Sequence, residues 1–330
     1  MKKDVSSHSG GWGMRIAIYI STHPRFPLVQ KVALMPEGGS NAATHAIPAP
    51  PPPLPTLCPP PPSLVKSKFF KKVADSSDPS VGECEELKKL IKKLLDRCCE
   101  TLKWILYNQH IPSLIQEGPQ CGLVALWMAG GLLGIKHEVP LDTIVQMAVS
   151  RGYTALGEMF SAANMACLAE EVYGCHCELL TGGMEGENRE RILRHLTEGL
   201  PVLIPYDEDF NHEPCKRNGH RAHWAVISGV LFGIWNGSLH PDPEIPGLYY
   251  PPANLPALHS DDLEQIYLIA KQGKSLRYQL WEYGCVSLSN SQLLQLDPKR
   301  SCDGNTYVIP EGGVRDGLSG KTLLLKRSEN

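Results

Sequence analysis

The sequence has no excess of charge of either sign and no long hydrophobic run. Lys and Arg total 32 and Asp and Glu total 35, for a formal net charge of −3. Nucleic-acid-binding proteins carry a basic excess or a basic stripe, so this balance argues against that class. No segment approaches the roughly 18 apolar residues of a membrane-spanning helix. The apolar run at residues 14–20 is short for a secretory signal and lacks a small-residue cleavage pattern. We therefore expect a soluble protein that is not secreted.

The cysteines lack the regular spacing of a disulfide-bonded scaffold. There are 11 of them, an odd number, scattered over 330 residues. Secreted disulfide-rich domains are smaller and more evenly patterned. Reduced thiols and a cytoplasmic location are the expected condition.

Proline is unevenly distributed along the chain. Ten of the 28 prolines fall within residues 48–62 (PAPPPPLPTLCPPPP), where they favour an extended polyproline II conformation. Such a segment is either a stiff spacer or a ligand for an aromatic-lined groove on a partner. We predict a disordered N-terminal region over residues 1–80, with the Pro-rich segment 48–62, followed by a single folded domain over residues 81–330.

The folded part predicts an α+β domain, because helical patterns come first and strand patterns follow. Apolar residues recur at three- and four-residue steps from Cys84 to Leu106, which predicts one amphipathic helix. The further expected helices are 121–133, 139–151, 160–173 and 189–197. The expected strands are 201–206, 223–232, 265–270, 278–283, 307–309 and 322–325. The order favours helices packed on an antiparallel sheet, with residues 236–262 as a surface insertion rich in Pro, Gly and His.

One cysteine lies where a helix is expected to begin. Cys121 follows a Gly-Pro turn and opens the apolar run CGLVALWM. The unpaired N–H groups at a helix N-terminus carry partial positive charge, which favours a thiolate. Gln116 and Gln120 lie just upstream, and either side-chain amide could stabilise an oxyanion. These features predict a nucleophilic Cys121.

A nucleophilic thiol needs a base, and the sequence offers one about a hundred residues later. His223, in GHRAHWAVISG, opens an apolar strand pattern. A cysteine on a helix and a histidine on a strand can meet across a cleft and convert to a thiolate–imidazolium pair, which later protonates a leaving amine. Each half alone is weak, since a lone buried cysteine is usually inert core. Together they predict papain-like chemistry with no cofactor.

The segments around these two residues resemble a known family. QEGPQCG followed by HWAVISG is similar to papain-like cysteine peptidases related to bacteriocin leader-processing enzymes, and more closely to the peptidases that mature actin. The resemblance implies a papain-like fold for most of residues 84–330. It is carried by the segments 111–130, 151–160, 204–214, 219–225, 271–275 and 278–283.

The resemblance implies an enzymatic activity, roles for the candidate site residues, and actin and profilin as partners. The enzyme would be a cysteine aminopeptidase that removes an N-acetylated first residue, Met or Cys, from newly made actin. Cys121 would be the nucleophile, His223 the general base and acid, and Gln116 the preferred oxyanion donor over Gln120. The family's glutamine usually lies six positions before the cysteine, whereas Gln116 lies five before. The Pro-rich segment 48–62 would bind profilin.

The residue that orients the imidazole is left open by the sequence. The family places an Asp or Asn on the strand after the histidine, and Asn236, Glu282 and Asn290 are the candidates. Actin is acidic just behind its first residue, so basic side chains near His223 could receive it. The candidates for that role are Lys216, Arg217 and Arg221.

Three other interpretations remain open. The first is a metal site, since His212, Cys215, His220 and His223 lie close in sequence and residues 175–177 read Cys-His-Cys. The second is a non-catalytic adaptor that acts through its Pro-rich segment. The third is an acyltransferase with the same Cys–His pair.

Overall fold

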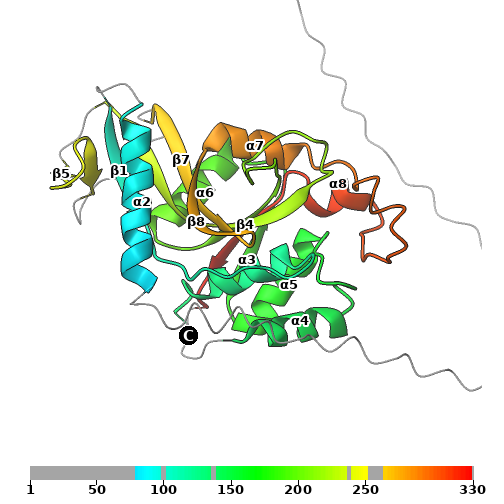
Figure 1. Cartoon of the computed structure of the whole chain (residues 1–330). Helices are drawn as coiled ribbons and strands as arrows, with labels where there is room; N and C mark the ends of the chain where they lie inside the picture. The colour runs from blue at the N-terminus through cyan, green and yellow to red at the C-terminus, as the bar shows by residue number, and fades with distance from the viewer. Residues whose placement is uncertain (1–78, 98–101, 135–138, 236–238, 252–262, 329–330) are drawn as a thin grey trace, which may run out of the picture. The chain divides into compact units, whose positions relative to one another are not determined.

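The computed structural model describes residues 79–97, 102–134, 139–235, 239–251 and 263–328 (Figure 1). All of them belong to one compact unit, residues 67–330. The Pro-rich segment 48–62 and nearly all of the expected N-terminal region lie outside the described residues, so the division at residue 80 stays a prediction. Within the described ranges, no helix is both long and apolar enough to cross a bilayer.

The described helices are short and divide into an early group and a late group. The early helices are α2 (Pro79–Leu95), α3 (Cys121–Gly130), α4 (Leu141–Ser150), α5 (Ala162–Tyr173) and α6 (Glu187–Thr197). The late helices are α7 (Tyr283–Ser291) and α8 (Gly313–Leu318). The predicted helices from residue 121 to 197 are thereby confirmed within a few residues at their ends.

A nine-stranded sheet forms the centre of the described domain. Its strands are β1 (Lys103–Asn108), β2 (His176–Leu180), β3 (Val202–Asp207), β4 (Ala222–Ile234), β5 (His240–Pro241), β6 (Leu248–Tyr250), β7 (Gln265–Gln272), β8 (Ser275–Glu282) and β9 (Thr322–Lys326). The order is β2-β9-β3-β4-β1-β6-β5, and β7 pairs with both β4 and β8. All pairs are antiparallel except β1 with β6. The expected α+β class is confirmed.

Strand β4 is the hub of the sheet because it is long enough to pair with three neighbours. Its first half pairs with β3 and its second half with β1, while β7 runs along its other edge. Its residues alternate between two hydrophobic clusters, as the two-residue period of a strand requires. Trp224 and Val226 belong to the cluster with α3 and α5, and Ala225 and Ile227 to the cluster with α6 and α7. Figure 1 shows α3, α4 and α5 grouped on one side of β4.

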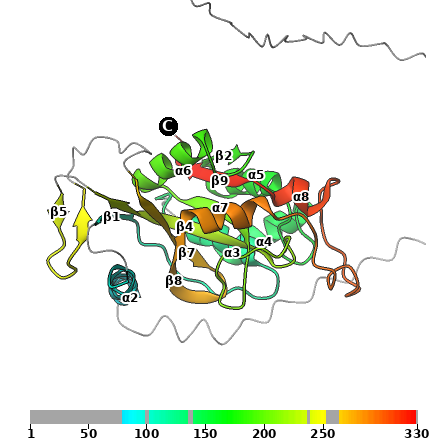
Figure 2. The ribbon, with the colours of Figure 1, turned by 90° about the horizontal axis from the view of Figure 1, so that it is seen from above.

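The long helix expected from Cys84 to Leu106 is wrong. Helix α2 ends at Leu95, and residues 103–108 form β1. The run Lys103–Tyr107 (KWILY) is rich in aromatic and β-branched residues, which suit a strand, and pairing with β4 and β6 fixes that choice. Helix α2 instead packs against β8 (Figure 2).

A second expectation also fails, since residues 307–309 form no strand. The backbone N–H of Val308 donates to the Glu158 carboxylate (2.9 Å), so a side chain takes the place of a neighbouring strand. The sequence patterns also missed β2, the short strands β5 and β6 within the insertion, and the helices α7 and α8.

Candidate active site

Cys121 is the first residue of α3, and the packing around Gly122 determines where it lies. A side chain at Gly122 would lie 2.7 Å from Met165 Cε, 2.9 Å from Met159 Cβ and 3.0 Å from Trp224 Cδ1. Only glycine lets the start of α3 approach β4 this closely. Cys121 is thus held beside the first residues of β4, with its side chain partly exposed.

Burial raises the pKa of the Cys121 thiol, while the backbone of Trp224, the residue that follows His223, and the cations Lys274 and Arg300 act to lower it. The expectation that the helix terminus yields a thiolate is therefore not confirmed. Loss of hydration outweighs the favourable charges, and the free site holds a thiol.

His223 is buried on β4, with 3% of its surface exposed. Its Nε2 lies 3.2 Å from Gln272 Oε1, and the same oxygen accepts the backbone N–H of Lys274 (2.6 Å). Because an amide oxygen can only accept, Nε2 carries the imidazole proton. Nδ1 is then left with a lone pair and is the nitrogen that can act as a base.

The charge on His223 follows from its surroundings. Burial lowers the pKa of His223 to about 4, whereas the nearby Glu208 carboxylate acts to raise it. The imidazole is accordingly neutral at pH 7. The residues on either side of His223, Ala222 and Trp224, line the recess with Cys121. In a pair made of a thiol and a neutral imidazole, the proton moves during attack.

The side chain that contacts the His223 imidazole is one that the sequence reasoning missed. Asn236 lies outside the described residues, Glu282 caps α7, and Asn290 Nδ2 donates to the carbonyl groups of Pro205 and Lys321. Gln272 is fully buried at the end of β7 and contacts the imidazole instead. The signal was present in KQGKS at 271–275, but the insertion before β7 hid that this is the strand beside β4.

The two candidate oxyanion glutamines lie in different places. Gln116 packs against Gly273, whose carbonyl accepts the Gln116 backbone N–H (2.7 Å). Its side-chain amide donates one N–H to Gly118 O (2.7 Å), which leaves the second N–H for a substrate. Gln120 packs against Gly157 on the other side of Cys121. Gln116 therefore lies next to Gln272, on the side where His223 is held.

A recess opens beside the sulfur. It is narrow, with a volume of ≈ 10 Å³, and its described lining is Pro119, Cys121, Glu158, Met159, Phe160, Ala222, Trp224, Arg300 and Leu318. Glu158 is the acid in this lining, and Arg300 is the cation. The Arg300 guanidinium lies over the Phe160 ring (5.2 Å) and the Tyr307 ring (5.3 Å).

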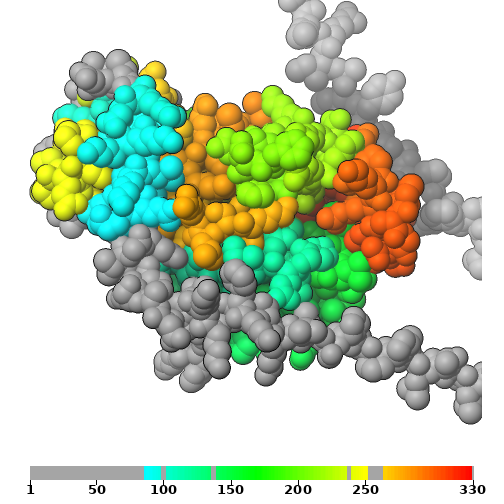
Figure 3. All heavy atoms as spheres, in the orientation of Figure 1, coloured from blue at the N-terminus to red at the C-terminus, as the bar shows by residue number. Residues whose placement is uncertain are grey.

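A larger basic pocket lies beyond His223. It measures ≈ 670 Å³ and is lined by Phe210, Arg217, Asn218, His220, Arg221, Asp297 and Lys299. Phe210 is 76% exposed, and the guanidinium groups of Arg217 and Arg221 each lie 4.8 Å from its ring. Figure 3 shows the segments that surround the site, residues 208–221 in yellow-green and residues 297–306 in orange-red, on one face. Lys216 is exposed but is not part of the lining.

The residues of the metal interpretation have separate partners. His212 Nδ1 contacts Glu208 (3.0 Å), His220 contacts Gln295 (3.2 Å) and His176 contacts Glu170 (3.5 Å). Within the part of the chain that the structure describes, no three His, Cys, Asp or Glu residues are arranged to hold a metal ion.

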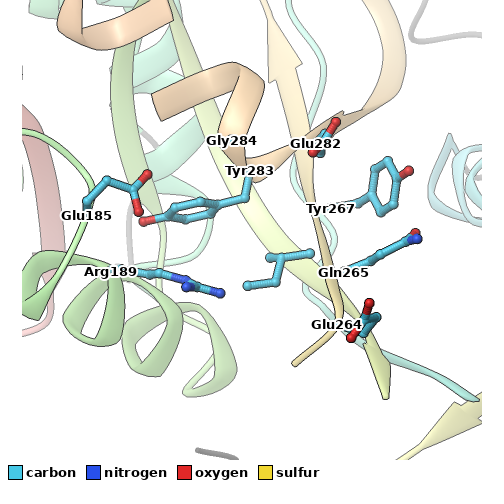
Figure 4. A pocket seen from close by; sticks show the side chains of 9 residues that line it. Glu185, Arg189, Glu264, Gln265, Tyr267, Glu282, Tyr283 and Gly284 are labelled. Carbon is cyan, nitrogen blue, oxygen red and sulfur yellow. The ribbon is translucent and has the colours of Figure 1, made fainter. Parts of the chain in front are cut away.

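A further pocket lies at the junction of α6, β7 and α7 (Figure 4). It has a volume of ≈ 360 Å³ and includes Glu185, Arg189, Tyr267, Glu282 and Tyr283. Cys121 and His223 do not line it, so it is separate from the recess.

Comparison with known proteins places this chain in a family. A family model described as "Actin maturation protease-like, C-terminal domain" matches residues 111–231. The actin maturation protease of Xenopus tropicalis is 69% identical over 81% of this chain and 88% of its own length. The human actin maturation protease is 52% identical over 79% of this chain and 77% of its own length. A C39-like peptidase from Bacillus anthracis, a solved structure, aligns with a TM-score of 0.37 and 12% identity over 69% of this chain and 99% of its own.

The class that these findings define is a peptidase. Since its relatives are this similar over most of their length, the chain belongs to the actin maturation protease family.

Proposed function

We propose that this chain is a cysteine aminopeptidase that removes the N-acetylated first residue, Met or Cys, from newly synthesised actin. The observation that carries the proposal is that Cys121 lines the same recess as Ala222 and Trp224, the two residues that flank His223 on β4. The names of the relatives support actin as the substrate.

The reaction follows from the protonation states of the two side chains. His223 Nδ1 accepts the Cys121 proton as the sulfur attacks the carbonyl carbon of the first residue. The second N–H of the Gln116 amide and the first N–H groups of α3 stabilise the oxyanion. The imidazolium then protonates the leaving amine, which becomes the new N-terminus of actin. Water hydrolyses the thioester and releases the acetylated amino acid.

The charges that line the recess favour an acetylated first residue over one with a free ammonium. Both oxygens of Glu158 are occupied by four donors, namely the Thr154 hydroxyl and the backbone N–H groups of Ala155, Leu156 and Val308. The remaining charged group in the described lining is the Arg300 cation. An N-terminal ammonium would meet this cation without a free carboxylate to pair with, whereas a neutral acetyl amide meets no such repulsion.

The basic pocket supports a role in holding the residues that follow the first. Arg217 and Arg221 present two cations beside an exposed aromatic ring, a combination that suits an acidic peptide. The Pro-rich segment 48–62 would bring profilin, and with it actin, to the enzyme. Its composition, typical of polyproline II ligands, supports this role.

The experiment is mass spectrometry of an acetylated actin N-terminal peptide after incubation with the full chain. We expect the loss of one acetylated residue, and we expect Cys121→Ala and His223→Ala to abolish it. Cys167→Ala, which removes an exposed thiol on α5, is the matched control and should remain active. A peptide that instead gains an acyl group would indicate a transferase. Full activity of Cys121→Ala would overturn the proposal.

A further inference from the structure

Glu208 is a buried carboxylate that the proposed mechanism has not used. It follows the last residue of β3, and its backbone N–H donates to Arg221 O (3.2 Å), two residues before His223. Its side chain is 3% exposed. A carboxylate at this depth must be paired, or it would be neutral.

The partners of Glu208 are groups that carry or can carry positive charge. Lys274 Nζ donates to Oε1, His212 Nδ1 lies 3.0 Å from Oε2, and Arg221 Nη2 lies 3.6 Å from Oε1. Burial by itself would raise the pKa of Glu208, but the interactions with His223, Lys274 and His212 outweigh it and hold the pKa below its usual value. Glu208 is therefore ionised at neutral pH.

Lys274 connects this carboxylate to the imidazole. Its backbone N–H donates to Gln272 Oε1, the oxygen that also contacts His223, while its ammonium binds Glu208. Tyr206, two residues before Glu208 and directly across from His223, packs its ring against the imidazole at 5.7 Å. The titratable groups that face His223 come from β3, the 208–214 loop and the β7–β8 turn. They are Tyr206, Glu208, His212 and Lys274.

We propose that Glu208 is a positioning residue that stabilises the imidazolium of His223 as it forms, acting through space and through its hold on Lys274. This inference rests on the proposed function. A single carboxylate can both orient an imidazole and balance its positive charge, whereas here two side chains share these effects. Gln272 sets which nitrogen carries the proton, but a neutral amide cannot balance a positive charge. Glu208 supplies the negative charge, and without it Lys274 and Arg221 would oppose protonation of His223.

The test is the pH dependence of kcat/KM for Glu208→Gln, with an acetylated peptide as substrate. Glu208 raises the pKa of His223, so its loss should lower that pKa. We expect the acid limb of the profile to move down by about one pH unit, while the plateau falls about tenfold to a hundredfold. A residue that only holds the loop would lower the plateau without moving the limb. If Glu208→Gln only made the protein less stable in acid, the acid limb would move to higher pH.

For Lys274→Met we expect the acid limb of kcat/KM to move in the opposite direction. This second variant keeps the proposal testable if Glu208→Gln does not fold. Lys274 lowers the pKa of His223, so its replacement should move the acid limb up, while its backbone N–H still binds Gln272. Limbs unchanged in both variants overturn this inference alone. Activity that survives His223→Ala overturns the proposed function instead.

Discussion

Two buried glutamates lie near the candidate catalytic residues, Glu158 in the recess with Cys121 and Glu208 near His223, and they differ in what binds them. Glu158, beside the recess, and Glu208, behind the histidine, are each 2% exposed. The donors to Glu158 are a hydroxyl and three backbone N–H groups, all neutral. Glu208 is held by Lys274, Arg221 and His212. Equal burial therefore does not imply an equal role.

The difference lies in where the negative charge is used. The backbone N–H groups that bind Glu158 belong to loop 154–158 and to Val308. Its carboxylate therefore links two loops through hydrogen bonds to their backbones. The charge of Glu208 acts on cationic groups, His223 among them. Glu158 thus holds the loops beside the recess in place, whereas Glu208 favours the protonated form of His223.

Outside Cys121 and His223, the largest effect on activity is expected from Gln272→Leu, which removes the oxygen that contacts both the His223 imidazole and the Lys274 backbone N–H. Leucine keeps the volume but removes the oxygen that fixes the Nε2–H tautomer. We expect kcat to fall about 1,000-fold, equivalent to about 4 kcal/mol, and the free energy of unfolding to fall by about 1 kcal/mol. Gln272→Glu keeps an accepting oxygen and should recover part of the activity.

Kinetics and urea unfolding of the same preparations would separate the two quantities. Gln265→Leu, at the start of the same strand and at the other pocket, serves as the control and should match the wild-type chain in kcat. If Gln272→Leu lost activity only in proportion to its lost stability, the assigned tautomer would be wrong.

Gln272 also shows how far the sequence can specify this site. Cys121 and His223 are readable because each opens an element with a clear local pattern, the apolar run of α3 and the apolar strand β4. The orienting residue is not readable in that way, since its role depends on β7 pairing with β4 across an insertion of about 30 residues. Neighbours in a sheet are decided by long-range pairing, which a local pattern does not contain.

The secondary structure shows the same distinction between what local patterns specify and what long-range pairing decides. Helix α3 was predicted from an apolar run after a Gly-Pro turn, and α4 to α6 from their local patterns. The segment 84–106 also has a helical spacing of apolar residues, and its second half was predicted wrongly. There, pairing of β1 with β4 and β6 overrides the local preference. The thiol pKa was misjudged for a related reason, since the helix terminus is visible in the sequence and the burial that opposes it is not.

The next effect concerns stability and is expected from Glu158→Gln. Replacing one carboxylate oxygen by an NH₂ group sets a donor against donors, so two of the four hydrogen bonds are lost. We expect the free energy of unfolding to fall by about 2 kcal/mol in urea titrations. The exposed Glu198→Gln should leave it unchanged. The acid limb of kcat/KM should not move, and a shift like that expected for Glu208→Gln would erase the distinction between the two glutamates.

The smallest effect is expected from Arg300→Met, which sharpens the comparison on the recess side. The Arg300 cation opposes an N-terminal ammonium but not an acetyl amide, so its removal should favour the free peptide selectively. We expect the ratio of kcat/KM for matched acetylated and free N-termini to fall about tenfold, equivalent to about 1.4 kcal/mol. The ratio isolates this effect, because any change in the thiol pKa lowers both rates equally. Lys299→Met, whose exposed cation lines the basic pocket rather than the recess, should leave the ratio as it is. If Arg300→Met also left the ratio unchanged, selectivity for the acetyl group would have to arise from shape alone.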